Sequence, residues 1–144
     1  MSLHGAYDDA NIFAKILRGE LPAVKAYEDE TALAILDLFP QSKGHTLVLP
    51  KGVKARNFIE LPADKVGPYM ACVQRLTIAV EKALKPDGVV VTQFNGAPAG
   101  QTIFHLHFHI IPRWEGVALA GHGHQNRADP AALQKIADTI AAQM

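Results

Sequence analysis

Three histidines alternate with apolar residues in the stretch GQTIFHLHFHIIPR, which covers residues 100–113. Alternation with a period of two is typical of a β-strand, because successive side chains of a strand point to opposite faces of the sheet. The spacing therefore predicts that His105, His107 and His109 share one face. The apolar residues between them are expected to pack into a core, while the histidine face lines a site.

Three hypotheses account for the histidine face. The rings are ordinary polar residues on an amphipathic strand, or they bind a metal ion, or one of them is a nucleophile in phosphorus chemistry. Burying several unpaired imidazoles is costly, which disfavours the first hypothesis. The choice between the other two depends on the residues that flank the strand.

The loop NGAPAGQ before the strand favours phosphorus chemistry. Gly96 and Gly100 let the backbone approach a ligand closely, and successive N–H groups in such a turn form an anion-binding nest. Gln101 and Thr102 add neutral hydrogen-bond donors. A phosphoryl group needs such donors as charge grows on its oxygens, whereas a metal site does not.

Length and composition narrow the function classes. At 144 residues the chain fits one domain, which we expect at residues 11–144 after a flexible lead-in at residues 1–10. The 14 lysines and arginines balance 14 acidic residues, so there is no overall positive field to bind nucleic acid. Residues 88–112 lack charged residues but hold too many polar ones for a membrane span. The single cysteine, Cys72, has no internal disulfide partner and we recognise no signal peptide, so we expect a cytoplasmic protein.

The hydrophobic patterns predict an α+β fold, in which a long helix and a C-terminal helix pack on an antiparallel β-sheet of about five strands. Besides the histidine strand, strands are expected at residues 24–28, 32–38, 44–50 and 88–94. Helices are expected from Asn11, from about residue 64 or 68 to residue 84, and from Pro130.

Residues 105–111 match the motif His-φ-His-φ-His-φ-φ, in which φ is an apolar residue. The preceding Gly-Gln-Thr, the stretch GHTLVLPK from Gly44 and the opening IFAKILRGELP from Ile12 accompany this motif. In the order and spacing of these motifs, over about residues 11–113, the chain resembles the histidine triad (HIT) superfamily and looks like a bacterial HIT-like protein. The resemblance implies a HIT-like fold and a nucleotide hydrolase or transferase that acts at an α-phosphate.

The resemblance implies that His107 is the nucleophile and forms a nucleotidyl-imidazole that water later cleaves. The chemistry of imidazole agrees, because an unperturbed pKa of about 6.5 leaves the ring largely neutral at pH 7 and able to attack without a separate base. The resemblance further implies that His109 contacts the phosphate oxygens or the bridging atom. It also implies that His105 holds the tautomers of the triad and that His45 supports it.

A nucleotide-binding set around the triad is implied by the same resemblance. Phosphate contacts are implied for Gln101 and Thr102, next to Gly100. Asn95 is a candidate to replace the polar residue that similar proteins often carry at position 94. Asp37 matches the acid that binds the ribose, and capping of a turn is the alternative. An apolar base pocket is implied for Ile12, Phe13, Ile16, Ile35, Leu36 and Leu38. Plain core packing accounts equally well for these apolar side chains.

Some positions depart from the family pattern. Asn11 and Ala14 stand where many similar bacterial proteins carry zinc-binding cysteines, so we expect no metal ion and no cofactor. Phe94 stands where similar proteins often carry a polar residue beside the phosphates. The segment Gly-His-Gly-His, with His122 and His124, is expected to be a mobile surface loop, and ligand contact is the alternative.

The resemblance thus implies a homodimeric enzyme that cleaves a purine nucleotide derivative, either a phosphoramidate or a dinucleoside polyphosphate, through an intermediate on His107. No nucleic-acid or membrane partner is expected. One alternative is a nucleotide-binding adaptor protein without catalysis, and the other is a metal-dependent hydrolase that uses the histidine cluster. The leaving group depends on the pocket beyond the phosphate, which we expect around Trp114, the Gly-His-Gly-His segment and the partner subunit.

Overall fold

The computed structural model describes residues 2–122 and 126–144, which contain a five-stranded sheet. The strands are β1 (Lys25–Glu28), β2 (Ala32–Leu36), β3 (Thr46–Pro50), β4 (Gly88–Thr92) and β5 (Phe108–Arg113). They lie in the order β1-β2-β3-β5-β4, and every neighbouring pair is antiparallel. The predicted α+β fold is confirmed, and the first four strands lie within two residues of their expected bounds.

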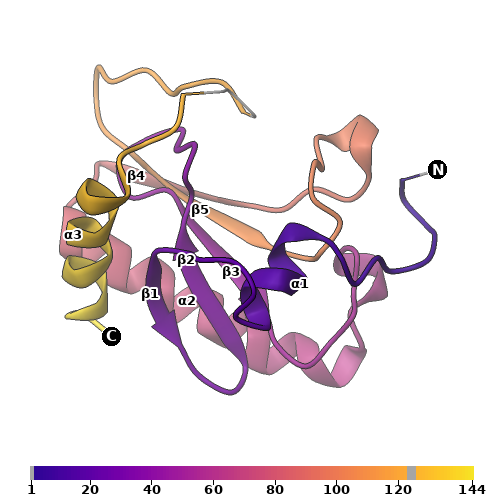
Figure 1. Cartoon of the computed structure of the whole chain (residues 1–144). Coiled ribbons are helices and arrows are strands. Elements are labelled where there is room, and N and C mark those ends of the chain that lie inside the picture. Colours follow the sequence, from indigo (N-terminus) through magenta and orange to yellow (C-terminus); the bar gives the residue numbers. More distant parts are fainter. Residues whose placement is uncertain (1, 123–125) are drawn as a thin grey trace.

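The helices are α1 (Ile12–Leu17), α2 (Ala63–Leu84) and α3 (Pro130–Ala141), with short 3-10 turns η1 (Phe58–Glu60) and η2 (Ala97–Ala99). Asn11 and Asp129 cap α1 and α3 as expected, because their side chains accept hydrogen bonds from N–H groups of the first turn. The long helix α2 and the C-terminal α3 lie together on one side of the sheet, whereas α1 lies on the other (Figure 1).

Strand β2 alternates between two hydrophobic clusters, one on each face of the sheet. Ala32, Ala34 and Leu36 belong to the large cluster that α2 and α3 cover. Leu33 and Ile35 belong to a smaller cluster with α1 and β3. Both faces of the central sheet are therefore buried near α1, and the smaller cluster supports the site described below.

The histidine segment is a strand only in its second half. β5 begins at Phe108, so only His109 of the three histidines lies in the strand, which corrects the expectation of a strand through the whole triad. The backbone before Phe108 has a different partner, because the Leu106 N–H donates to the carbonyl of Ala55 in the connection after β3.

The alternation of side chains nevertheless continues beyond the end of the strand. Leu106, Phe108 and Ile110 pack in the cluster under α2. His107 and His109 line a cleft together with α1 side chains from the other cluster. The predicted separation of an apolar face from a histidine face therefore holds for these residues.

The segment before α1 hydrogen-bonds to loops near the histidines. The buried Arg56 guanidinium donates to the carbonyl of Ser2, and the Asn57 amide donates to the carbonyl of Leu3. The Arg56 guanidinium also stacks over the Phe104 ring. These contacts attach the segment before α1 to the rest of the protein. The flexibility expected of this segment stays a prediction.

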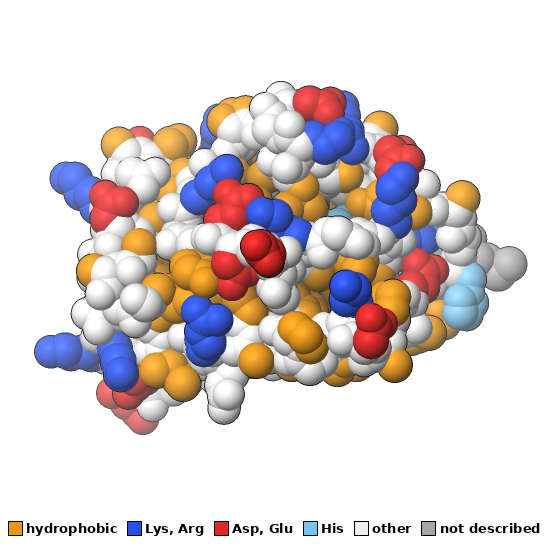
Figure 2. Space-filling view, turned by 90° about the horizontal axis from the view of Figure 1, so that it is seen from below, with side chains coloured by type: hydrophobic (Ala, Val, Ile, Leu, Met, Phe, Trp, Pro, Cys, Tyr) orange, Lys and Arg blue, Asp and Glu red, His pale blue; other side chains and the backbone are white. Residues whose placement is uncertain are grey.

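Charges of both signs are interspersed on the face shown in Figure 2, where lysines and arginines stand among acidic residues. This agrees with a formal net charge of zero. In the part of the chain that the structure describes, no helix has the length and hydrophobicity needed to cross a membrane.

Candidate active site

A cleft of about 410 Å³ lies between α1, the segment after β2, the start of β3 and the histidine segment. The predicted site residues that line it are Ile12, Phe13, Ile16, Ile35, Leu36, Asp37, Leu38, His45, Thr102, His107 and His109. Lining residues that sequence reasoning did not single out are Pro22, Ala23, Val24, Phe39, Gln41, Leu47 and Ile103, and the cleft is also lined by His122, for which ligand contact was the alternative. Segments far apart in the sequence thus converge on one concave site.

His107 lines this cleft with a defined tautomer. Its Nδ1 lies 2.6 Å from the carbonyl oxygen of His105. A carbonyl only accepts, so Nδ1 carries the proton and Nε2 keeps its lone pair. Burial lowers the pKa of His107, although its hydrogen bond to His105 and the charge of Asp37 act in the opposite direction. The ring is therefore neutral near pH 7, and Nε2 is in the form that acts as a nucleophile.

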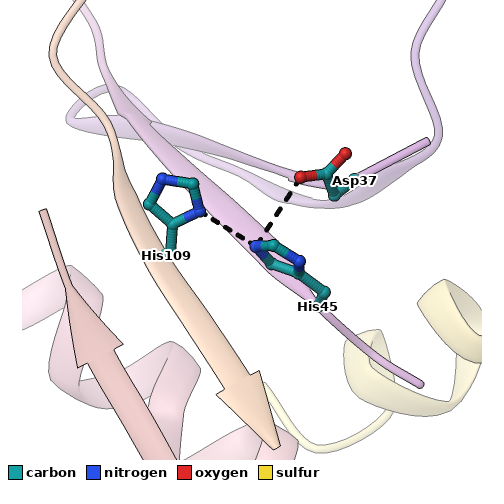
Figure 3. Close-up of side chains that lie close together, drawn as sticks. All are labelled: Asp37, His45 and His109. Atoms are coloured by element: carbon teal, nitrogen blue, oxygen red, sulfur yellow. Dashed lines mark hydrogen bonds and ion pairs between the residues drawn. The ribbon is translucent and has the colours of Figure 1, made fainter. Parts of the chain in front are cut away.

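His45 and His109 form a directional hydrogen-bond relay (Figure 3). The Gln41 backbone N–H donates to His45 Nδ1 at 3.0 Å, so the His45 proton must be on Nε2. His45 Nε2 lies 2.9 Å from His109 Nδ1 and 3.6 Å from Asp37 Oδ2. His45 therefore donates to His109 Nδ1, and the proton of His109 is on Nε2.

His109 Nε2 is buried and has no hydrogen-bond partner among the described residues. Burial and the nearby His107, His45 and His122 lower the pKa of His109 to about 2, so the ring is neutral at physiological pH. An unsatisfied buried N–H costs free energy and is rare in folded proteins. Because His109 lines the cleft, this N–H is a candidate donor to an acceptor atom of a ligand.

Asp37, His45 and His109 could also be considered as metal ligands, since one ligand atom of each lies within 4.8 Å of the others. Metal binding at His45 Nε2 would require the proton to move to Nδ1. Nδ1 faces the Gln41 N–H, so the moved proton would meet another donor instead of an acceptor. The donor set therefore fits a hydrogen-bond relay better than a metal site.

Of the two roles considered for Asp37, the structure shows the cap of a turn, and the ribose contact stays a prediction. Asp37 Oδ1 accepts from the Phe39 N–H at 2.8 Å, which caps the turn after β2. Its Oδ2 is the oxygen near His45, and the residue lines the cleft. A partly exposed carboxylate at this place can accept hydrogen bonds from the hydroxyls of a bound sugar.

The apolar wall of the cleft also belongs to the core. Phe13, Ile16, Ile35 and Leu36 are buried, and Phe13 packs edge-on against the His107 ring at 4.8 Å between centroids. Ile12 differs, since 52% of its surface is exposed while it lines the cleft. Core packing thus accounts for most of these residues, whereas the exposed Ile12 is available for a ligand.

The loop before the triad does not form the expected anion nest. The Gly96 N–H donates to the side chain of Gln101, and the Ala97 N–H donates to the hydroxyl of Ser2. The N–H groups of residues 99–101 donate to carbonyls within the loop. These donors are already satisfied inside the protein, because the loop closes on itself through η2.

The side chains of this loop fall into two groups. Gln101 is buried and donates to the carbonyls of Arg56 and Ile103, and Asn95 accepts from the Phe58 N–H. These two residues, like Gly100, are outside the cleft lining and hold the loop in place. Thr102 is exposed and lines the cleft, so its hydroxyl remains accessible to a ligand.

Tyr7 is a partner of the triad that the sequence did not reveal. Its hydroxyl lies 2.6 Å from His105 Nδ1, while His105 Nε2 faces the carbonyl of Pro50 at 3.4 Å. The carbonyl accepts from Nε2, so Tyr7 donates to Nδ1. Burial lowers the pKa of His105 to about 4, so this ring is also neutral. His105 lies outside the cleft lining, and it acts on His107 through its backbone carbonyl.

His122 also lies at the cleft, although the sequence favoured a surface loop. Its Nε2 lies 2.9 Å from the carbonyl of Gly100, and its ring contacts the rings of Phe94 and His109. The Gly-His-Gly-His segment was the only sequence feature that pointed to His122, and its spacing from the triad does not predict that the two lie together. His124 lies outside the described residues.

Comparison with known proteins identifies the family. A family model of the HIT domain matches residues 18–116. An uncharacterized HIT-like protein from Methanocaldococcus jannaschii is 50% identical over 105 residues, which cover 73% of this chain and 80% of that protein. The adenosine 5′-monophosphoramidase of Schizosaccharomyces pombe is 42% identical over 102 residues, which cover 71% of this chain and 73% of that protein.

A solved structure agrees with this sequence similarity. The crystal structure of a Hit-like protein from Bartonella henselae, which is described as involved in cell-cycle regulation and holds an unknown ligand, matches with a TM-score of 0.90. The two are 43% identical, and the match covers 97% of this chain and 100% of that one. The chain belongs to the HIT family, as the triad motif predicts.

The contact between Tyr7 and His105 can be tested by unfolding experiments. We expect Tyr7→Phe to lower the free energy of unfolding by about 1–2 kcal/mol, because it leaves the buried Nδ1 of His105 without a donor. Tyr27→Phe is the matched control, because the Tyr27 hydroxyl donates to the partly exposed Asp29 carboxylate, where water can replace it. Urea titrations that give equal losses for both variants would contradict this role of Tyr7.

Proposed function

We propose that this protein is a nucleotide hydrolase that cleaves a purine nucleoside phosphoramidate at the α-phosphate through a covalent intermediate on His107. The observation that carries the proposal is the pair of ring nitrogens at the cleft. His107 Nε2 has a lone pair, and His109 Nε2 has an N–H without a partner among the described residues. A nucleophile beside a hydrogen-bond donor is what an attack on a phosphoryl group requires.

The reaction proceeds in two displacements. His107 Nε2 forms a bond to the α-phosphorus, and the bond from phosphorus to the leaving group breaks with its electron pair on the leaving group. The positive charge that develops on the His107 ring strengthens its Nδ1–H hydrogen bond to the His105 carbonyl. Water then attacks the phosphorus, the bond to Nε2 breaks, and the nucleoside monophosphate leaves. The leaving group takes up one proton and water returns one, so the enzyme regains its starting state.

The charges of the cleft support an amine as the leaving group. Among the described lining residues there is no lysine or arginine, and Asp37 is an acid. A polyphosphate leaving group carries several negative charges that this wall does not offset, whereas an amine carries none. The relative from Schizosaccharomyces pombe is named an adenosine 5′-monophosphoramidase, which also supports the phosphoramidate class.

The decisive experiment is turnover of adenosine 5′-phosphoramidate and of diadenosine tetraphosphate in excess chelator. We expect the unaltered protein to cleave the phosphoramidate faster. His107→Ala and His107→Asn should lower the rate by about 10³-fold or more, because the nucleophile is lost. Intact-mass measurement after a rapid alkaline quench, which preserves a phosphorus–nitrogen bond, should show a nucleoside monophosphate adduct in the unaltered protein alone.

His4→Ala is the matched control for these variants, since His4 is exposed and outside the cleft lining. Full activity in His107→Asn would refute the assignment of the nucleophile. Activity that the chelator stops would support the metal-dependent alternative. Tight binding of adenosine monophosphate without turnover of either substrate would support the adaptor alternative.

The pH dependence of kcat/KM tests the state of the nucleophile. Protonation removes the lone pair of His107, and its pKa is lowered by burial. As the pH falls, activity should therefore persist below pH 6.5, the value for an ordinary histidine, and be lost only at lower pH. The measurement is kcat/KM between about pH 4.5 and pH 8 for adenosine 5′-(4-nitrophenyl) phosphate, whose leaving group needs no proton. Circular dichroism at each pH controls for unfolding, and a midpoint at or above pH 6.5 would contradict the proposal.

We also propose a homodimer formed through β4. This strand is at the edge of the sheet, and its Val90 and Val91 are 38% and 42% exposed. On α2, which packs beside β4, Ile78 is 45% exposed. An edge strand with exposed apolar side chains on both faces is suited to pair with its symmetry mate across a two-fold axis.

Light scattering after size exclusion tests the dimer. We expect the unaltered protein to be a dimer. The Val91→Lys variant should be shifted toward monomer, because the substitution places a charge in the proposed interface. Ile59→Lys, on the exposed turn η1, is the matched control and should remain dimeric. An unaltered protein that is monomeric at micromolar concentrations would overturn the dimer proposal.

The cytoplasmic location and the lack of a nucleic-acid partner stay predictions.

A further inference from the structure

His122 is a titratable residue of the cleft to which the proposed mechanism assigns no role. It lies in the connection between β5 and α3, and it reaches the cleft next to the last histidine of the triad. Its ring lies edge-on to His109, with 5.7 Å between centroids, and 5.1 Å from Phe94. The Phe94 side chain has no hydrogen-bond donor or acceptor, whereas the His122 ring brings two polar nitrogens to this end of the cleft.

The connection that carries His122 is attached to the rest of the site on both sides of this residue. Ala120 exchanges two hydrogen bonds with Gln41, one to its backbone and one with its side chain. Farther along, the Ala128 N–H donates to the carbonyl of Leu38. Both attachments are in the segment between β2 and β3, the segment that also contributes Asp37 and His45 to the cleft. The position of His122 is thus tied to the same frame as the relay.

The ring contacts define a direction along the cleft. Phe13 of the apolar wall packs on His107, His107 packs on His109, and His109 packs on His122. A base in the apolar part would therefore place its phosphate at His107 and His109. The leaving group, which is bonded to the phosphate on the side opposite the nucleoside, then lies toward His122.

The hydrogen bond of His122 fixes which nitrogen is available. Nε2 lies 2.9 Å from the Gly100 carbonyl, which only accepts, so Nε2 carries a proton. Nδ1 is the remaining nitrogen of the ring, and it can bind or release a proton without breaking this attachment. Imidazole is the side chain best suited to such proton transfer near neutral pH.

We propose that His122 donates a proton to the leaving group, an inference that rests on the proposed function. As His107 Nε2 bonds to the α-phosphorus, the phosphorus–nitrogen bond of the phosphoramidate breaks and its electron pair takes the proton from His122 Nδ1. A neutral amine departs, and His122 is left neutral. In the second displacement the attacking water gives a proton to His122 Nδ1, which restores the starting state. His109 meanwhile donates its Nε2–H to a phosphate oxygen.

The test compares two substrates that differ in their need for a proton. Adenosine 5′-(N-butyl)phosphoramidate releases an amine that must be protonated, whereas adenosine 5′-(4-nitrophenyl) phosphate releases a stable phenolate. For His122→Ala we expect kcat/KM to fall about 100-fold with the phosphoramidate and to change less than about threefold with the nitrophenyl ester. His122→Gln can keep the hydrogen bond to Gly100 but has no titratable nitrogen, so we expect the same selective loss.

Each outcome has a separate meaning. A selective loss in both variants supports proton donation. Full phosphoramidate activity in His122→Gln would reduce His122 to a positioning residue and overturn the inference. Equal losses with both substrates, or no loss with either, would overturn it as well. An unaltered protein that cleaves neither substrate would overturn the proposed function itself, and the proposal for His122 with it.

Discussion

The hydrogen bond between His107 Nδ1 and the His105 carbonyl is the interaction on which the chemistry of the site depends. It exists because β5 begins only at Phe108. In a continuous strand the carbonyls point toward neighbouring strands and pair with them. Here the chain bends before the strand, so the carbonyl of one histidine meets the ring of the next in the triad. The irregular backbone thus sets the tautomer of the proposed nucleophile.

The neighbouring relay has the opposite effect on His109, because it leaves the proton on Nε2 of that ring. A backbone N–H of Gln41 fixes the tautomer of His45, which in turn fixes that of His109. Two rings 5.0 Å apart therefore offer different groups, a lone pair on one and an N–H on the other. Neither tautomer depends on an acid or a metal ion, because backbone groups determine both.

The sequence predicted the secondary structure well where it follows from local patterns of residues. The alternation of histidines, the caps at Asn11 and Asp129 and the spacing of apolar residues predicted the sheet and the helices, whereas most of the predicted cleft residues were implied by the resemblance to the HIT family. Long-range contacts were not accessible in this way. Tyr7 lies 98 residues from His105 in the sequence, and nothing in its neighbourhood indicates that contact.

The glycine-rich loop shows a different limit of sequence reasoning. Its composition suits an anion nest, but its own side chains and carbonyls satisfy its N–H groups. Hydrogen-bond competition of this kind depends on the folded path of the chain and not on residue type. For Gln101, the side chain expected at the phosphate holds the loop closed instead.

The burial of the triad also has a thermodynamic consequence for the fold. Burial lowers the pKa of His105 to about 4 and that of His109 to about 2, whereas in the unfolded chain both rings take up protons below about pH 6.5. Between these values the unfolded state binds more protons than the folded state, so stability falls as the pH falls, by up to about 1.4 kcal/mol per pH unit for each ring. The burial that keeps these imidazoles neutral, as the proposed chemistry requires, therefore also makes the fold less stable in acid.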